Sequence, residues 1–204
     1  SFWRGTASAA LFFLLVLSGL PLLLLYVPSV ERAYQSVKDI EYVVTFGWWI
    51  RAVHRIGAHL MVIAVVLHLT RVFFTGAYKN GVGQGQRREW NWVIGIVMLL
   101  LTLFLSFTGY LLPWDQLAFW AVTVSVNIVA SVPVVGATMR DLLIGGHDIG
   151  QAALMRFYLL HIVVLPIVGA VLFAYHLWRI RKDGGLARPM NGCDDRPEDA
   201  VGLE

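Results

Sequence analysis

The sequence is poor in charge and in cysteine. Only 14% of its 204 residues are Asp, Glu, Lys or Arg, against about 25% in soluble domains. The single cysteine, Cys193, excludes a disulfide scaffold, and nineteen glycines without a period of three exclude a collagen-like chain. Apolar residues make up 58% of the chain, which excludes intrinsic disorder and exceeds what one water-soluble core can hide. The composition therefore predicts an integral membrane protein.

Four long apolar stretches account for this excess. A helix needs about 20 mostly apolar residues to cross a membrane, and spanning helices are predicted over residues 7–27, 46–75, 92–114 and 157–180. A further uncharged stretch contains Pro133 and several polar residues, so the segment 116–142 is predicted to form short interfacial helices. The predicted fold is all-α, with a four-helix transmembrane bundle over 1–182 and a soluble tail over 183–204.

The charges divide between the two ends of this bundle. With four spans, one side receives the basic residues Arg4, Lys79, Arg87, Arg88, Arg179, Arg181, Lys182 and Arg188. The other side receives the acidic residues Glu31, Asp39, Glu41, Asp115, Asp141 and Asp148. Because basic loops stay in the cytoplasm, both termini are predicted on that side, which is electrically negative. The net charge of +3 is then a topological signal and predicts no nucleic-acid partner.

Two of the predicted helices each carry a pair of widely spaced histidines. His54 and His68 are fourteen residues apart on one helix, and His161 and His176 are fifteen apart on another. These spacings correspond to about 21 and 22 Å along a helix axis. Since both helices run in the same direction, their first histidines pair toward the outer side and their second histidines toward the inner side. Facing imidazoles at two depths predict the axial ligands of two six-coordinate b haems, which transfer single electrons.

The alternative to haem ligation is that these histidines serve only in packing or hydrogen bonding between helices. Taken singly, a histidine in a membrane helix more often forms a hydrogen bond between helices. The pairing by depth favours haem, because ionisable groups in hydrocarbon are costly and an ordinary zinc or iron site needs its ligands at one depth. His59 lies about 140° around the helix from His54 and is assigned a packing role. His147 is expected in a solvated loop.

Glycines and arginines support the haem interpretation. Two pairs of glycines have the fourteen-residue spacing of the first histidine pair, namely Gly5 with Gly19 and Gly95 with Gly109. Glycine lets a backbone approach a flat macrocycle, so these residues are predicted to clear the two haems, the alternative being ordinary helix packing. Arg51, Arg55 and Arg71 lie near the histidines in sequence. They are predicted to bind the haem propionates, the alternative being that they reach the lipid headgroups.

Three stretches of sequence carry a family resemblance. They are 46–55 (Phe-Gly-Trp-Trp-Ile-Arg-Ala-Val-His-Arg), 108–116 (Thr-Gly-Tyr-Leu-Leu-Pro-Trp-Asp-Gln) and 156–161 (Arg-Phe-Tyr-Leu-Leu-His). Over about residues 2–188, the chain resembles the N-terminal, haem-bearing part of cytochrome b from the quinol:cytochrome c reductase (bc) and b6f complexes. The fifteen-residue histidine spacing, the Pro-Trp-Asp-Gln loop and the end after four helices make it more similar to the split cytochrome b6 type.

The resemblance implies a role in bifurcated quinol oxidation. It assigns the low-potential outer haem to His54 and His161, and the high-potential inner haem to the other pair. It assigns the quinone-site residues of this chain as Trp114, Phe119 and Trp120 on the outer side and Arg181 on the inner side. One electron from each quinol is expected to reach an iron-sulfur protein, and the other to cross the membrane and reduce quinone. Protons are released outside and taken up inside.

The same resemblance implies partners and a location. The expected partners are a Rieske-type iron-sulfur protein, a c-type cytochrome, membrane lipid and a separate C-terminal cytochrome b (subunit IV-like) chain carrying the Pro-Glu-Trp-Tyr motif. A dimeric complex is expected in an energy-transducing membrane, the bacterial plasma membrane or alternatively the thylakoid. Cytochrome b6 attaches a further c-type haem to a cysteine that aligns with Trp3. Two non-covalent haem b groups and no covalent haem are therefore expected.

Two other functions stay open from the sequence. One is the dihaem membrane anchor of another quinone-reducing respiratory enzyme, against which the Pro-Trp-Asp-Gln loop and the glycine pairs argue. The other is a haem-free structural or transport bundle, in which the histidines pack or relay protons.

Overall fold

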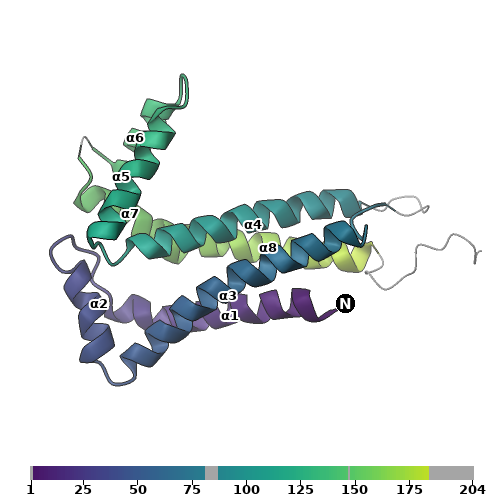
Figure 1. The fold of residues 1–204 in the computed structure, drawn as a ribbon, viewed down its shortest axis with the longest axis horizontal. Helices are drawn as coiled ribbons and strands as arrows, with labels where there is room; N and C mark the ends of the chain where they lie inside the picture. Colours follow the sequence, from purple (N-terminus) through teal and green to yellow (C-terminus); the bar gives the residue numbers. More distant parts are fainter. Residues whose placement is uncertain (1, 81–86, 147, 184–204) are drawn as a thin grey trace, which may run out of the picture.

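The computed structural model describes residues 2–80, 87–146 and 148–183, which form an all-helical bundle (Figure 1). Its long members are α1 (Phe2–Leu25), α3 (Gly47–Phe74), α4 (Arg88–Leu111) and a continuous helix over Gln151–Lys182. The continuous helix consists of α7 (Gln151–Leu159), η1 (Leu160–Val164) and α8 (Leu165–Lys182). Each long helix is long and apolar enough to cross a membrane. The predicted four-helix membrane fold is confirmed, with the first, third and last of the long helices starting earlier than residues 7, 92 and 157.

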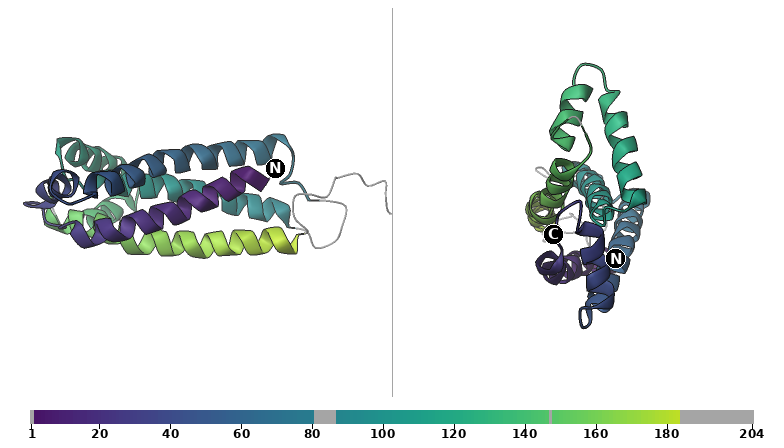
Figure 2. Two further views of the ribbon diagram at one scale, coloured as in Figure 1. Left: turned by 90° about the horizontal axis from the view of Figure 1, so that it is seen from below. Right: turned by 90° about the vertical axis from the view of Figure 1, so that its left-hand side faces the viewer.

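Short helices connect the long ones at one end of the bundle. α5 (Gln116–Ala130) and α6 (Gly136–Ile144) occupy the predicted interfacial segment and project away from the bundle axis (Figures 1 and 2). Asp115 caps α5, because its carboxylate accepts a hydrogen bond from the backbone N–H of Ala118 at 2.8 Å. α2 (Ala33–Tyr42) lies between α1 and α3. A search for apolar runs does not find α2, since it is short and half polar.

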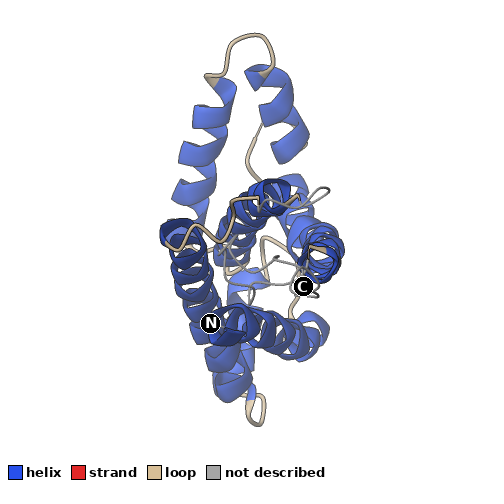
Figure 3. Ribbon diagram, turned by 90° about the vertical axis from the view of Figure 1, so that its right-hand side faces the viewer, coloured by secondary structure: helices blue, strands red, loops and turns tan. Residues whose placement is uncertain are grey.

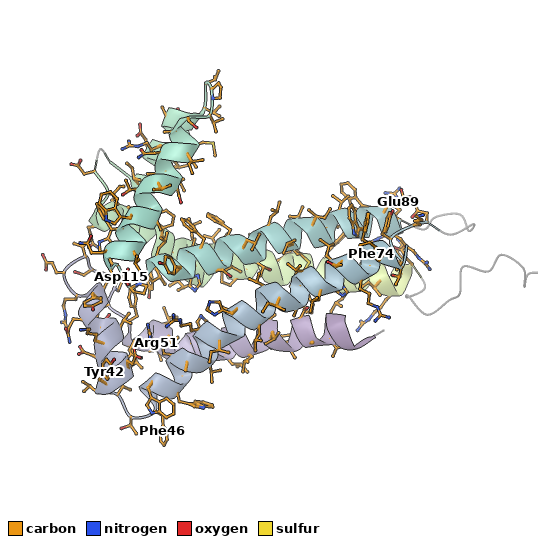
Figure 4. All side chains as sticks on the ribbon, in the orientation of Figure 1. Tyr42, Phe46, Arg51, Phe74, Glu89 and Asp115 are labelled. Atoms are coloured by element: carbon orange, nitrogen blue, oxygen red, sulfur yellow. The ribbon has the colours of Figure 1, made fainter. Side chains whose placement is uncertain are left out.

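The long helices alternate in direction. The N-terminus and the connection from α3 to α4 lie at one end, here called the inner end, and α2, α5 and α6 lie at the other, the outer end (Figures 1 and 2). Figure 4 marks these ends, with Phe74 and Glu89 at the inner end and Tyr42, Phe46 and Asp115 at the outer end. α3 and the α7–α8 helix therefore point the same way, as the pairing of histidines by depth requires.

The tightest packing lies at the outer end. A cluster of buried side chains joins α4 and α7 to the short helices, and consists of Leu111, Ala118, Val122, Val126, Ile144, Ala153 and Phe157. Far less is buried along the long helices, where only 6 to 17% of each most apolar window lies inside the protein. Outward side chains such as Leu24 (84% exposed) and Phe74 (80%) are large and apolar, which suits contact with lipid or with other helices.

A π-helical turn, η1, interrupts the last long helix and contains His161. Within it, the backbone N–H of Leu165 donates to the carbonyl of Leu160, five residues earlier. A π turn takes up one residue more than an α turn. Fifteen residues that include this turn therefore rotate about as far as fourteen residues of regular α-helix. The π turn explains why His161 and His176 are fifteen residues apart, whereas the pair on the regular helix α3 is fourteen apart.

Candidate functional site

A cavity of about 1130 Å³ lies between the four long helices, and all four predicted histidine ligands line it. Figure 3 looks along the bundle and shows the long helices grouped around its axis. The volume exceeds the roughly 300–1,000 Å³ of a typical site for one small ligand. Four further lining residues are the predicted glycines Gly5, Gly19, Gly95 and Gly109. The long helices thus enclose a space larger than one ordinary small-ligand site, between the histidines and the glycines.

His54 of α3 and His161 of η1 face each other in the outer half of the cavity. Their ring centroids are 6.3 Å apart, and their ring planes are inclined by 80°. Metal–imidazole bonds of about 2.0–2.1 Å put two bonded nitrogens about 4 Å apart across one metal ion, and the rings add about 2 Å between centroids. The observed separation therefore fits one iron between the two imidazoles, with a macrocycle supplying the remaining ligands.

His68 of α3 and His176 of α8 lie together in the inner half of the cavity. They are close enough for a direct electrostatic interaction, and both line the cavity. The structure thus brings together the two pairs that depth predicts, while their role as haem ligands stays a prediction. His59 also lines the cavity, but it is exposed, and its Nδ1 lies 2.8 Å from the Arg55 carbonyl, a local contact that fits a packing role. His147 lies outside the described residues.

Two hydroxyl groups that the sequence pattern did not bring forward contact the outer histidines. Oγ of Ser18 on α1 lies 3.0 Å from Nδ1 of His54. Oγ1 of Thr108 on α4 lies 3.1 Å from Nδ1 of His161. With Nδ1 engaged in this way, Nε2 is the nitrogen of each ring that stays available to a metal. A signal for them exists in the sequence, since each hydroxyl residue directly precedes one of the predicted glycines.

Three of the four glycines lie against histidine rings. A Cβ atom added to Gly109, Gly19 or Gly5 would be 2.7, 3.3 or 3.4 Å from the Cε1 atom of a predicted histidine ligand. Gly95 differs, because a Cβ atom there would meet only Leu69, at 3.9 Å. Gly5, Gly19 and Gly109 therefore make room for the imidazoles themselves, in addition to the room predicted for the macrocycles.

The predicted propionate partners lie in different surroundings. Arg51 and Arg55 line the cavity, and Figure 4 shows Arg51 at the outer end. Nη1 of Arg51 is 2.6 Å from Oε2 of Glu41 on α2. This ion pair, which the sequence pattern did not suggest, ties α2 to α3. Arg71 lies in the last turn of α3, three residues after His68, and is not one of the residues that line the cavity.

The residues predicted for the quinone sites lie beside the cavity. Trp114 has a φ of 51° and packs against the buried cluster at the outer end. Phe119 and Trp120 follow on α5 with ring centroids 5.8 Å apart, and Trp120 is 58% exposed. Arg181 is exposed on α8. In the described part of the chain none of these four lines the cavity, so their contact with quinone stays a prediction.

Tyr26 ties the end of α1 to the end of α4. Its phenol donates a hydrogen bond to the Leu112 carbonyl at 2.6 Å, and its ring lies 5.5 Å from that of Tyr158. Burial, with a smaller contribution from Tyr158, raises the pKa of the Tyr26 phenol. The phenol therefore stays protonated and remains a donor at physiological pH.

A buried ion pair ties α8 to the start of α4 at the inner end. Nη2 of Arg179 donates to both carboxylate oxygens of Asp183, at 2.8 and 3.0 Å, and both residues are 5% exposed. The backbone N–H of Arg87 and the guanidinium of Arg88 also donate to Asp183, each at 3.4 Å. Asp183 is thus packed against the bundle, although it was predicted to begin the tail. The rest of that tail, with Cys193, lies outside the described residues.

Comparison with known proteins agrees with this architecture. The family model described as Cytochrome b/b6/petB matches residues 1–184. A cytochrome b6 from Synechococcus elongatus is 42% identical over 180 residues, which cover 88% of this chain and 81% of that protein. A cytochrome b6 from Prochlorococcus marinus (strain MIT 9303) is 44% identical over 167 residues, covering 82% of this chain and 74% of that protein.

A solved structure extends the agreement to three dimensions. A chain of a structure titled "Hyperthermophilic respiratory Complex III" superimposes with a TM-score of 0.76 and 27% sequence identity. The match covers 96% of this chain and 51% of that chain, so the present chain spans about half the length of that relative. The likeness in fold and the identity to cytochrome b6 concern the same haem-bearing part of the family that the histidine and glycine pattern resembles. The chain therefore belongs to the cytochrome b/b6 family and corresponds to its N-terminal part.

Proposed function

We propose that this chain is the dihaem cytochrome b subunit of a quinol:cytochrome c oxidoreductase complex, or of a complex with a similar acceptor. In this role, electrons cross the membrane from an outer quinol-oxidation site to an inner quinone-reduction site and contribute to the proton gradient. The observation that carries the proposal is the pairing of four histidines, from two parallel helices, at two depths of one cavity. The family membership supports it.

Different residues of the cavity would hold the two haems. His54 and His161 would hold the outer, low-potential haem, and His68 and His176 the inner, high-potential haem. Bound in this way, haem supplies reversible one-electron transfer without an open coordination position. The chain itself keeps the two imidazoles of α3 about 21 Å apart at fixed depths. The arginines at the cavity wall offer positive charge to the propionates.

The quinol-oxidation site requires more than this chain. Oxidation of a quinol releases two electrons and two protons. One electron passes to a Rieske-type iron-sulfur protein and onward to a c-type cytochrome, while the other crosses the membrane. Two electrons that cross in this way, with two protons taken up on the inner side, reduce one quinone there. Trp114, Phe119 and Trp120 form this chain's part of the outer site, and Arg181 belongs to the inner one. A separate subunit IV-like chain with the Pro-Glu-Trp-Tyr motif completes a dimeric complex in an energy-transducing membrane.

Absorbance spectroscopy of the purified complex tests the proposal. We expect a b-type band near 560 nm, roughly the usual position for bis-histidine haem, in the reduced-minus-oxidised spectrum. We also expect two haems per chain that acid acetone extracts completely, because Trp3 stands where cytochrome b6 has its attaching cysteine. Absence of the band would end the proposal. Haem left on the extracted polypeptide, detected as a pyridine haemochrome, would contradict only the non-covalent attachment.

The partners separate this function from that of another dihaem membrane anchor. An iron-sulfur protein and a small three-helix subunit should copurify with the chain when the complex is isolated in mild detergent. Copurification of a peripheral hydrogenase or formate dehydrogenase in their place would favour the anchor function instead.

A further inference from the structure

We propose that the hydroxyls of Ser18 and Thr108 are positioning groups for the outer histidines, and that they lower the potential of the outer haem. Each hydroxyl accepts a hydrogen bond from the Nδ1–H of a predicted ligand, fixes the tautomer of its ring and increases the donor strength of its Nε2. The inference deepens the proposed function and rests on it, since it concerns haem held by His54 and His161.

The direction of the bond at Ser18 follows from the hydroxyl's own partner. Ser18 is 9% exposed, and its Oγ donates to the Leu14 carbonyl at 2.7 Å on the same helix. A hydroxyl has a single proton, so the same oxygen can only accept from a second partner. The contact of 3.0 Å with Nδ1 of His54 is therefore an N–H donated by the imidazole.

Thr108 repeats this arrangement on the opposite side of the cavity. It is 0% exposed, and its Oγ1 donates to the Leu105 carbonyl at 3.0 Å. Its oxygen therefore also accepts, from Nδ1 of His161 at 3.1 Å. The two hydroxyls come from α1 and α4, whereas the histidines come from α3 and η1. Both outer rings are thus held by hydroxyls from helices that carry neither histidine.

A hydrogen bond at Nδ1 has an electronic consequence for a metal at Nε2. An imidazole that donates its other N–H becomes a more basic ligand. Acceptors of this hydrogen bond therefore change the reduction potential of the bound iron. A stronger donor stabilises ferric over ferrous haem. The outer haem therefore has a lower potential with these hydroxyls than without them.

The sequence provides an internal contrast between the two depths. The outer glycines, Gly19 and Gly109, directly follow Ser18 and Thr108. The inner glycines Gly5 and Gly95 instead follow Arg4 and Ile94. Since neither arginine nor isoleucine carries a hydroxyl, the hydroxyl–glycine pattern occurs in the sequence at the two outer glycines and not at the two inner ones.

The competing explanation is that both hydroxyls only satisfy carbonyls of their own helices, as Ser and Thr commonly do in membrane helices. Thr123 on α5 offers a matched control, because its Oγ1 donates to the Phe119 carbonyl at 2.8 Å and it lies on a helix outside the histidine pairs. A role limited to such back-bonding predicts that Ser18→Ala, Thr108→Val and Thr123→Val behave alike.

Redox titration of the intact complex, followed at the b-type band, distinguishes these explanations. In Ser18→Ala and in Thr108→Val we expect the ferric-to-ferrous ratio of the outer haem at fixed ambient potential to fall about threefold, a rise of about 28 mV at 59 mV per tenfold. The inner haem is the reference within each sample and should not shift. Thr108→Ser should keep the wild-type potential, and Thr123→Val should leave both haems unchanged.

The other possible results also either support or overturn the role of the hydroxyls. Unshifted outer potentials in both hydroxyl variants of a two-haem complex overturn this proposal and leave the proposed function intact. If Thr108→Val loses the outer haem, retention of that haem in Thr108→Ser supports the hydroxyl, whereas loss in both assigns the residue to packing alone and overturns the proposal. A wild-type complex without b haem overturns the proposed function, and this inference with it.

Discussion

At the scale of single residues, the site depends on how closely backbone approaches the histidine rings. Gly109 is the extreme case, since a Cβ atom there would lie 2.7 Å from Cε1 of His161. Real Cβ atoms do not approach other atoms so closely, so either the His161 ring or one of the two helices must shift. Gly57 is a useful comparison on α3, because a Cβ atom there would meet the end of the flexible Leu15 side chain at 3.3 Å.

Gly109→Ala is expected to displace His161 and to weaken binding of the outer haem. Because changes around a metal ligand typically cost 10–100-fold in affinity, we expect a loss of roughly tenfold or more. The haem affinity is measured by titrating the complex with an apoprotein that competes for haem. The control Gly57→Ala should keep both haems, since Leu15 can yield and alanine favours the helix by about 1 kcal/mol. Equal haem affinity in the two variants would refute the close approach at Gly109.

At the scale of the elements, the π turn decides how the last long helix presents its histidines. In a regular α-helix, an additional residue rotates everything beyond it by about 100°. η1 absorbs that residue between His161 and His176, and Pro166, which lacks a backbone N–H, follows directly after the turn. The helix thereby presents both histidines to one cavity.

Deletion of Val164 combined with Pro166→Ala is therefore expected to keep two haems per chain. The change shortens the histidine spacing to fourteen and lets the segment become a regular α-helix, which has about the same rotation. Deletion of Val65 in the regular helix α3 is the counterpart, because it rotates His68 by about 100° relative to His54. That variant should bind about one haem. Haem-to-protein ratios measure both, and an equal ratio in the two deletions would rule out the compensating role of η1.

At the scale of the whole molecule, two histidine pairs occupy separate halves of one cavity. The outer half is bordered by the buried cluster of α4 to α7, and the inner half by the ion pair of Arg179 with Asp183. Since different residues support each half, loss of one haem need not unfold the other site.

His68→Leu is accordingly expected to lower the haem content from two to about one per chain while the outer haem keeps its potential. The physical reason is that only the inner pair loses a ligand, whereas the outer histidines keep their hydroxyl partners. Pyridine haemochrome analysis and redox titration of the complex measure both quantities. His59→Leu serves as the control and should retain two haems, because His59 is exposed and contacts its own helix. Loss of both haems from a stably folded His68→Leu complex would contradict the pairing.

The sequence by itself determined the class of fold and the depth of the candidate ligands. Uncharged runs long enough to span a membrane predict the four long helices, since hydrocarbon tolerates few charges. The rise of 1.5 Å per residue converts a spacing of fourteen or fifteen into two depths. Both conclusions depend only on distances along a single helix, and such distances can be read from the sequence.

The tertiary structure decided everything that depends on contact between helices. It placed Ser18 and Thr108 on the outer histidines, paired Arg51 with Glu41, packed Asp183 against the bundle and left Trp120 outside the cavity wall. It also revealed the π turn η1, in which a backbone N–H donates to the carbonyl five residues earlier. A single turn of this kind is too short to change the spacing of apolar residues in the sequence. Such contacts join residues as far as 96 positions apart in sequence, as between Arg87 and Asp183. Local composition and periodicity describe one segment at a time, and only the packing of segments determines which side chains meet.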